Sequence, residues 1–188
     1  MSKAPLILAS ESPRRKEILS RLGFKFTAVH PRFEEIHEYL PPSLIPVINA
    51  CGKAGSVAEM HPSSIVIGAD TIIEFEGGTL GKPGTISDAK NMLLRLSGKK
   101  HSVVTCVCMM KDDDRAKCVF CDSTDVVFRK LTDPAADEYL SRVHTLDKAG
   151  AYAIQEHGDM IIEEVDGSID NVIGFPSEKF LKAASLWL

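Results

Sequence analysis

The sequence predicts an α/β protein with a mixed, twisted sheet and flanking helices. Short apolar segments alternate with segments of helical periodicity along most of the chain, which favours strands joined by crossover helices. Residues 101–110 and 116–128 are apolar and β-branched and are separated only by a short polar stretch, so they predict a long antiparallel hairpin. Because both kinds of connection occur, we expect a mixed rather than a purely parallel sheet.

The N-terminal half predicts alternating strands and helices. A buried strand at Leu6–Ala9 is followed by a helix with Pro13 in its first turn and Gly23 at its end. After a strand at 24–29 and the polar loop HPRFEEIHEYLPPS, the pattern predicts a helix at 43–60.

The next segment, SSIVIGADTIIEF, predicts two strands around a Gly-Ala-Asp-Thr turn, with EGG as a hairpin turn after them. TLGKPGTIS is predicted as a loop, and Ser87 as the cap of a helix at 88–96. Beyond the long hairpin, LTDPAADEYLSRV predicts a helix that is capped by Thr132 or Asp133. A glycine-rich region with short strands precedes a final helix at 177–186.

Composition limits the class of protein. The 188 residues are 44% hydrophobic and carry a net charge of -4, which indicates one folded domain over residues 1–188 and argues against binding to a nucleic-acid backbone. No window is apolar for long enough to span a bilayer, and the apolar part of the N-terminus is too short for a secretory signal. The five cysteines, an odd number, suit free thiols in a reducing compartment, so we expect a cytoplasmic protein without a membrane or nucleic-acid partner.

Two adjacent arginines stand where the first strand meets the first helix. Cations in a first helical turn oppose the helix dipole, and an anionic ligand would resolve that conflict. Ser10, Ser12, Arg14 and Arg15 would all supply donors to such an anion. The alternative is that both arginines are solvated on a polar face.

Carboxylates form the second group of candidates. Asp70 follows an apolar strand and could hold a divalent metal or act as a base on water, with Thr71 as a donor to substrate; alternatively, Asp70 bonds its own backbone in a turn. The FEEIHE loop offers Glu34, Glu35 and Glu38 as ligands for a hard metal, or is simply a solvated acidic loop.

Other candidates lie in glycine-rich segments and among the cysteines. Lys82 in LGKPG suits a phosphate, and Gln155 in DKAGAYAIQ suits the edge of a base, although both also fit ordinary turns. Cys118-Val-Phe-Cys121 has a spacing found in zinc sites, but two strand residues three apart face opposite sides, so buried strand cysteines are the favoured interpretation. No P-loop, dinucleotide fingerprint or GxSxG motif is present.

Taken together, these segments resemble the Maf family of nucleoside triphosphate pyrophosphatases. The similarity runs in order along nearly the whole chain, through LILASESPRRKEIL, FEE, IGADTII, LGKP, LSGKKHSVVT, DKAGAYAIQ and NVIGFP. The resemblance implies an inosine triphosphatase-like fold with two lobes around a cleft, and a homodimer. The segment VINACGK departs from the family pattern, because it lacks the arginine and glutamate expected before Lys53.

The resemblance also implies the chemistry, which is hydrolysis between the α- and β-phosphates with the help of Mg²⁺ or Mn²⁺. Asp70 would be the base or a metal-linked acid, and Glu34 or Glu35 would help to hold the metal. The phosphates would be bound by Arg14, Arg15, Lys53 and Lys82. Arg14, Thr71 and Gln155 match the branch that acts on dTTP and UTP, with modified pyrimidine triphosphates as further candidates. The alternative is a nucleotide-binding regulator of cell division that has no turnover.

Overall fold

The computed structural model describes residues 4–37 and 40–187. The chain divides into two compact units. Three strands contribute residues to both: β3 (Ile65–Phe75), β5 (Lys100–Lys111) and β6 (Ala116–Phe128). The first unit comprises residues 1–70, 105–122 and 174–188, and the second comprises residues 71–104 and 123–173. This division agrees with the two lobes that the resemblance implies. Within the described residues, no helix is long and apolar enough to cross a membrane.

The described residues form a seven-stranded mixed sheet with the order β2-β1-β3-β5-β6-β7, and β4 pairs with β3. Strand β1 runs parallel to both of its neighbours, whereas β4 and β7 are antiparallel to theirs. The predicted mixed α/β class is therefore confirmed. The strands are β1 (Leu6–Ala9), β2 (Thr27–Val29), β3 (Ile65–Phe75), β4 (Gly78–Leu80), β5 (Lys100–Lys111), β6 (Ala116–Phe128) and β7 (Ile162–Asp166).

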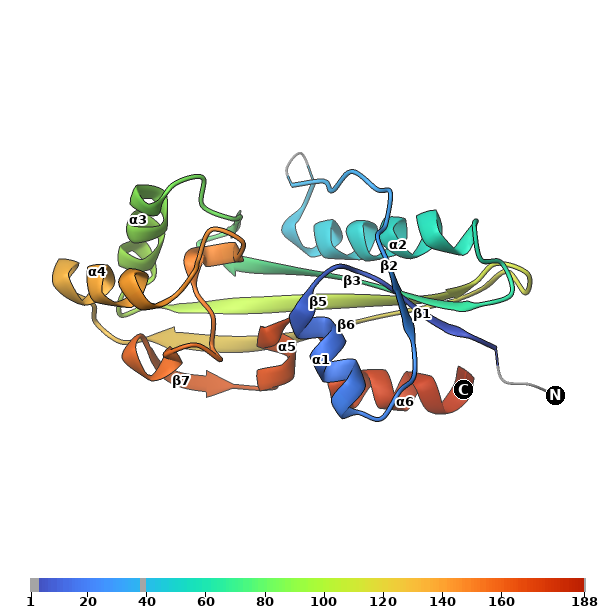
Figure 1. The fold of residues 1–188 in the computed structure, drawn as a ribbon. Helices are drawn as coiled ribbons and strands as arrows, with labels where there is room; N and C mark the ends of the chain where they lie inside the picture. Colours follow the sequence, from blue (N-terminus) through green and yellow to red (C-terminus); the bar gives the residue numbers. More distant parts are fainter. Residues whose placement is uncertain (1–3, 38–39, 188) are drawn as a thin grey trace. The chain divides into compact units, whose positions relative to one another are not determined.

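Helices flank the strands in both units. In the first unit, α2 lies on one face of the sheet and α1 and α6 lie on the other (Figure 1). In the second unit, α3 packs against α4. The helices are α1 (Pro13–Arg21), α2 (Ile45–Ala58), α3 (Ile86–Leu96), α4 (Asp133–Arg142), α5 (Ile169–Ile173) and α6 (Ser177–Trp187), with short 3₁₀ turns at Pro42–Leu44, Ala149–Ala151 and Gly158–Met160.

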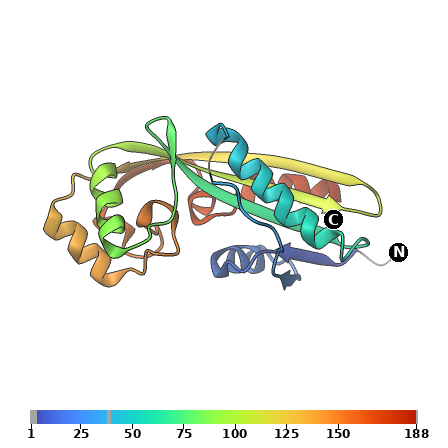
Figure 2. The same cartoon turned by 90° about the horizontal axis from the view of Figure 1, so that it is seen from above.

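A glycine lets α2 approach the sheet closely. A Cβ atom on Gly68 of β3 would lie 2.3 Å from the carbonyl oxygen of Ala50 and 2.7 Å from the amide nitrogen of Ala54, both in α2. No side chain fits such a gap, so the backbones of helix and strand meet directly. Figure 2 shows α2 lying along β3. The close approach brings the polar residues on the buried face of α2 next to β3.

The core of the second unit contains a group of aromatic rings around one buried histidine. His101 is 3% exposed, and its Nε2 lies 2.8 Å from the hydroxyl of Tyr152. Phe128 packs edge-to-face against both rings. Because this environment is dry, burial lowers the pKa of His101 to about 4.

Two local predictions are wrong near the centre of the chain. The Gly-Ala-Asp-Thr segment is not a turn, because Ile65–Phe75 is one continuous strand and Asp70 lies in its middle. The hairpin at Glu76 and Gly77 is confirmed, with positive φ at both residues as a two-residue turn of this type requires. Its second strand, Gly78–Leu80, occupies part of the predicted loop.

The cap of α3 and the state of two cysteines also differ from expectation. Thr85, rather than Ser87, caps α3, and its hydroxyl accepts a hydrogen bond from the amide of Asp88. The prediction of free thiols is wrong for Cys106 and Cys121, which form a disulfide between β5 and β6. Neighbouring strands place facing side chains close enough to bond, but the sequence alone does not reveal the register of the hairpin.

Candidate active site

Among the described residues of the first unit, Asp70 is the acid that is buried. It lies in the middle of β3, is 6% exposed, and faces α2. Its Oδ1 accepts a hydrogen bond of 2.7 Å from Lys53 Nζ, and its Oδ2 accepts one of 3.0 Å from Asn49 Nδ2. Both donors come from α2, so the close approach of α2 at Gly68 determines how this carboxylate is held.

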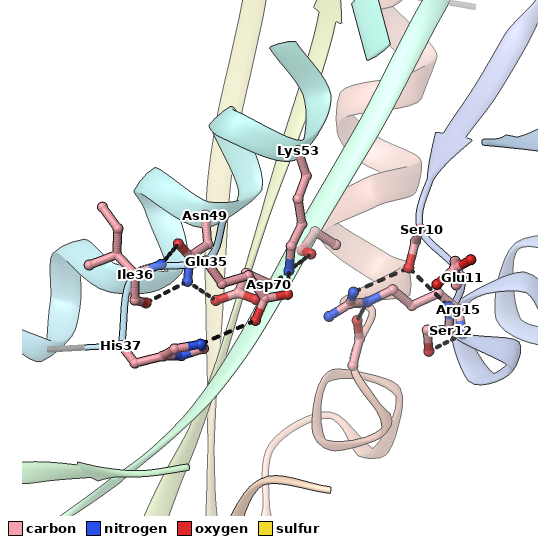
Figure 3. Close-up of polar contacts among 12 residues, drawn as sticks. Ser10, Glu11, Ser12, Arg15, Glu35, Ile36, His37, Asn49, Lys53 and Asp70 are labelled. Atoms are coloured by element: carbon pink, nitrogen blue, oxygen red, sulfur yellow. Dashed lines mark hydrogen bonds and ion pairs between the residues drawn. The ribbon is translucent and has the colours of Figure 1, made fainter. Parts of the chain in front are cut away.

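Lys53 binds a second carboxylate as well. Its Nζ lies 2.7 Å from Glu35 Oε1, and the Lys53 residue is only 6% exposed. A buried ammonium ion is costly unless it is paired, and here two carboxylates pair with it. Figure 3 shows Lys53 reaching from α2 to the place where Asp70 and Glu35 converge. The three residues form a polar centre, which we call the Lys53 cluster.

The loop that carries Glu35 is attached to α2 at two points. Asn49 accepts a hydrogen bond from the amide of Ile36 at 2.9 Å and donates one to the carbonyl of the same residue, also at 2.9 Å. Phe33 packs against Gly52, where a Cβ atom would lie 2.1 Å from the ring. These contacts direct Glu35 towards Lys53. Asn49 thus joins the Glu35 loop, α2 and Asp70 through one buried amide.

Arg15 faces the Lys53 cluster from α1. Its Nε donates to the carbonyl of Gly174 at 3.0 Å, and its Nη1 donates to Ser10 Oγ at 3.4 Å. Figure 3 shows its guanidinium group pointing towards Asp70. Burial lowers the pKa of Arg15, and the charges of Asp70 and Glu35 oppose that shift. Arg15 therefore belongs to the same electrostatic environment as the two acids.

Ser12 caps the start of α1, where its hydroxyl accepts a hydrogen bond of 3.5 Å from the amide of Arg15. Ser10 accepts another from the amide of Ser12 at 3.2 Å. Arg14 is half-buried and lies near Arg15. The positive charge of Arg14 lowers the pKa of Arg15 further. The beginning of α1 thus brings serine hydroxyls and two guanidinium groups together, as an anion site requires.

The structure separates the two candidate glutamates. Glu35 contacts Lys53, whereas the adjacent Glu34 is exposed. The third acid of this loop, Glu38, lies outside the described residues. Of these acids, Glu35 is the one that the structure pairs with Lys53, which also binds Asp70.

The remaining predicted residues belong to the second unit. Thr71 follows Asp70 in β3, and because side chains alternate along a strand, the two point to opposite faces of the sheet. Lys82 and Gln155 are both exposed, Lys82 before α3 and Gln155 in a turn after Ala153. Their proposed contacts with a substrate remain predictions.

Sequence reasoning did not single out Asn49. The available signal was its position four residues before Lys53 in a predicted helix, which places both polar side chains on one face together with Ile45. A buried polar residue on the apolar face of a helix needs a partner, and here the partners are Ile36 and Asp70.

In its overall fold, the chain is similar to known structures of Ham1 proteins. The Ham1 protein of Staphylococcus aureus superposes with a TM-score of 0.52 at 16% identity, covering 97% of this chain and 98% of that protein. A HAM1 protein from Coxiella burnetii superposes with a TM-score of 0.57 at 13% identity, covering 97% and 99%. At these identities the likeness shows the fold alone, so the chain is an α/β protein of Ham1-like architecture.

Sequence comparison identifies the family. The model of the Maf-like protein family matches residues 5–185. A dTTP/UTP pyrophosphatase of Akkermansia muciniphila is 44% identical over 95% of this chain and 94% of the relative. A dTTP/UTP pyrophosphatase from Bacillus velezensis is 40% identical over 95% of this chain and 94% of the relative. One from Bacillus cereus is 41% identical over 94% of this chain and 87% of the relative. The chain belongs to the Maf-like protein family, as the resemblance of its motifs predicted.

Proposed function

We propose that this protein is a nucleoside triphosphate pyrophosphatase that hydrolyses dTTP and UTP to the monophosphate and pyrophosphate. The observation that carries the proposal is the Lys53 cluster, in which a buried ammonium holds two carboxylates opposite the arginine-bearing start of α1. The names of the relatives, all dTTP/UTP pyrophosphatases, support the choice of substrate.

In the proposed reaction, Asp70 orients a water molecule and takes its proton. A carboxylate accepts several hydrogen bonds, so Asp70 keeps lone pairs for water after bonding Lys53 and Asn49. Those two bonds hold the carboxylate in one orientation, which is how a general base gains efficiency. The oxygen of the water then forms a bond to the α-phosphorus, while the bond to the bridging oxygen breaks and pyrophosphate leaves.

Arg14, Arg15 and the beginning of α1 are proposed to bind the phosphate groups. Guanidinium groups make bidentate contacts with phosphate oxygens, and the free amides at a helix start add further donors. Lys82 would contribute a further positive charge. Thr71 and Gln155 would contact the base, with Arg14 as the third residue that marks the dTTP and UTP branch.

A divalent metal fits the donor set of this site. No group of three or more acids, histidines or cysteines able to hold a metal occurs within residues 4–37 and 40–187. Mg²⁺ is often held by only one or two carboxylates together with substrate phosphates, and Glu35 and Asp70 supply two carboxylates. When bound, Mg²⁺ or Mn²⁺ would supply positive charge that offsets the charge of the phosphates.

The test is turnover of a panel of nucleoside triphosphates with separate detection of pyrophosphate and orthophosphate. We expect pyrophosphate from dTTP and UTP in Mg²⁺ or Mn²⁺, and loss of turnover when EDTA removes the metal. Release of orthophosphate alone would contradict cleavage between the α- and β-phosphates. Binding of UTP without turnover would instead support the nucleotide-binding regulator.

A further inference from the structure

Gln155 stands in a tight turn of the second unit, and both ends of that turn are held by buried side chains. The amide of Glu156 donates a hydrogen bond of 3.4 Å to the carbonyl of Ala153, so residues 153–156 close a turn in which Gln155 is the third residue. Gln155 is exposed, whereas Ala153 is only 8% exposed. The exposed glutamine is therefore carried by a turn that begins in the core.

The first end of the turn is held by Tyr139 of α4. Tyr139 is fully buried, and its hydroxyl contacts both backbone groups of Ala153. The hydroxyl accepts a hydrogen bond from the amide at 3.0 Å and donates one to the carbonyl at 3.3 Å. Burial raises the pKa of Tyr139 to about 12, so at neutral pH the hydroxyl keeps the proton that it donates. A helix side chain thus fixes the backbone two residues before Gln155.

The second end of the turn is held by Lys148. Its side chain is only 7% exposed, and its Nζ lies 2.9 Å from Asp147 Oδ1 and 3.6 Å from Glu156 Oε1. The same Nζ donates a hydrogen bond to the carbonyl of His144. A buried ammonium ion is costly unless it is paired, so Lys148 has a strong reason to keep Glu156 close. Glu156 directly follows Gln155, and this ion pair therefore restrains the other side of the glutamine.

The chain between Lys148 and the turn is held by its contacts rather than by local preference. Ala151 is fully buried and has a φ of +62°, which residues with a side chain rarely adopt. Gly150, just before it, has a φ of +68°, and its amide donates to the carbonyl of Gly81 at 3.0 Å. Backbone of this kind persists only where the surrounding structure holds it. Loss of a contact at either end should therefore let the turn move.

We propose that Tyr139 and Lys148 are positioning residues that fix Gln155 for the selection of the base, an inference that rests on the proposed function. A glutamine amide carries one donor group and one acceptor group. Thymine, like uracil, presents a carbonyl oxygen where cytosine presents an amino group. A freely moving glutamine could turn its amide to suit either base. A glutamine on a fixed turn can prefer one of them, so the contacts of the turn decide the preference.

The experiment measures nucleotide binding, so that it does not depend on catalysis. The probes are analogues of UTP and CTP in which an imido group replaces the oxygen between the α- and β-phosphates, which blocks the proposed cleavage. Titration calorimetry on the purified full chain gives the ratio of the two dissociation constants. We expect the wild type to prefer the UTP analogue and Tyr139→Phe to lower this preference about tenfold, as the loss of a well-placed contact with a base would. Lys148→Met should lower it as well, and an unchanged ratio in either variant would overturn the role given to that residue.

Matched controls separate positioning from a general loss of stability. Tyr152→Phe removes the hydroxyl of another buried tyrosine in the same core, but that hydroxyl lies 2.8 Å from His101 Nε2 rather than at the turn. Lys90→Met removes a lysine that also pairs with two acids of the second unit, Asp133 and Asp137. Both controls should keep the preference of the wild type. An equal loss of preference in Tyr139→Phe and Tyr152→Phe would overturn the proposal.

A double variant shows whether the effect passes through Gln155. Gln155→Ala should abolish the preference, and adding Tyr139→Phe to it should then change the ratio no further, because residues that act as a unit are not additive. A further loss in the double variant would mean that Tyr139 acts by another route and would overturn the proposal. Hydrogen exchange without nucleotide gives a direct structural readout. The amide of Ala153 should exchange faster in Tyr139→Phe than in Tyr152→Phe, and equal rates would count against the hold on the turn.

Failure of the proposed function would look different. If the wild type prefers the UTP analogue but releases no pyrophosphate from UTP, the proposed hydrolysis is wrong, and the variants still decide whether Gln155 is positioned as we infer. If the wild type binds both analogues equally, Gln155 selects no base. The positioning proposal is then overturned, even where UTP is hydrolysed.

Discussion

The ammonium of Lys53 and the carboxylate of Asp70 form a buried ion pair, with Nζ 2.7 Å from Oδ1 and less than a tenth of either side chain exposed. Two backbone features make this pair. Gly68, two residues before Asp70 in β3, removes the Cβ atom that would hold α2 away, and α2 then places Lys53 over the strand. The geometry of the site therefore depends on helix–strand packing as well as on its charged residues.

Replacement of Asp70 by asparagine tests the proposed base. Asp70→Asn keeps the size of the side chain but removes its capacity to accept a proton, so turnover of dTTP should fall by about 10²- to 10⁴-fold. The measurement is the rate of pyrophosphate release at saturating substrate. Glu74→Gln is the control. Glu74 is a half-buried acid of the same strand, and its replacement should leave the rate close to that of the wild type. Comparable rates in the two variants would remove Asp70 from the chemistry.

Replacement of Asn49 by leucine tests the link between the Glu35 loop and Asp70. The variant leaves the amide and carbonyl of Ile36 without their partner, which should lower the free energy of unfolding by about 1–3 kcal/mol. It also releases one oxygen of Asp70, so kcat should fall by roughly ten- to a hundredfold, with a smaller change in KM.

The matched control for Asn49 is Asn91→Leu, which alters an exposed residue of α3. Chemical denaturation measures stability, and steady-state kinetics separates kcat from KM. A loss of stability with unchanged kcat would show that Asn49 supports the fold without positioning Asp70.

Replacement of Gly68 by alanine tests the close approach of α2. The new Cβ atom would lie 2.3 Å from the carbonyl oxygen of Ala50, so α2 must move away. We expect the free energy of unfolding to fall by about 1–3 kcal/mol or more, and activity to fall because Lys53 moves with the helix. Gly55→Ala is the control, since a Cβ there meets nothing within 4 Å and should stabilise the helix by about 1 kcal/mol. Full activity in Gly68→Ala would contradict the role given to this contact.

The buried His101 predicts a dependence of stability on pH. Burial lowers its pKa from 6.5 to about 4, so between these values the unfolded chain binds a proton that the folded chain does not. The contribution of neutral His101 to the free energy of unfolding is fully present above pH 6.5. It is lost as the pH falls towards 4, and the free energy of unfolding then decreases by about 3 kcal/mol at most. Denaturation curves of the wild type should show this slope, and His101→Phe should show a shallower one.

Tyr152→Phe provides the comparison for His101. It removes the hydroxyl that lies 2.8 Å from His101 but keeps the histidine, so stability should drop while the slope with pH remains. Equal slopes in the wild type and in His101→Phe would assign the pH dependence to other groups.

Much of the fold could be predicted from local patterns. Leu6–Ala9 and the two long strands of the hairpin were predicted because apolar and β-branched residues repeat with the period of a strand. Pro13 and Gly23 mark the limits of α1 for local reasons. The ring of Pro13 fixes φ at a helical value in the first turn, and Gly23 adopts a φ of +83° after the last turn. The prediction of a turn at Asp70 was wrong. Gly-Ala-Asp-Thr has turn composition, but β3 pairs with β1 as far as Gly68 and with β5 on its other side, and it continues as one strand to Phe75.

The sequence by itself determined the α/β class, the set of chemical groups and the family, since these depend on periodicity, residue type and the order of motifs along the chain. The tertiary structure decided which groups meet. It paired Glu35 with Lys53, bonded Asn49 to Asp70, and joined Cys106 to Cys121. The physical reason is that these choices depend on strand register and on the close packing of α2 at Gly68, which bring together residues far apart in the chain.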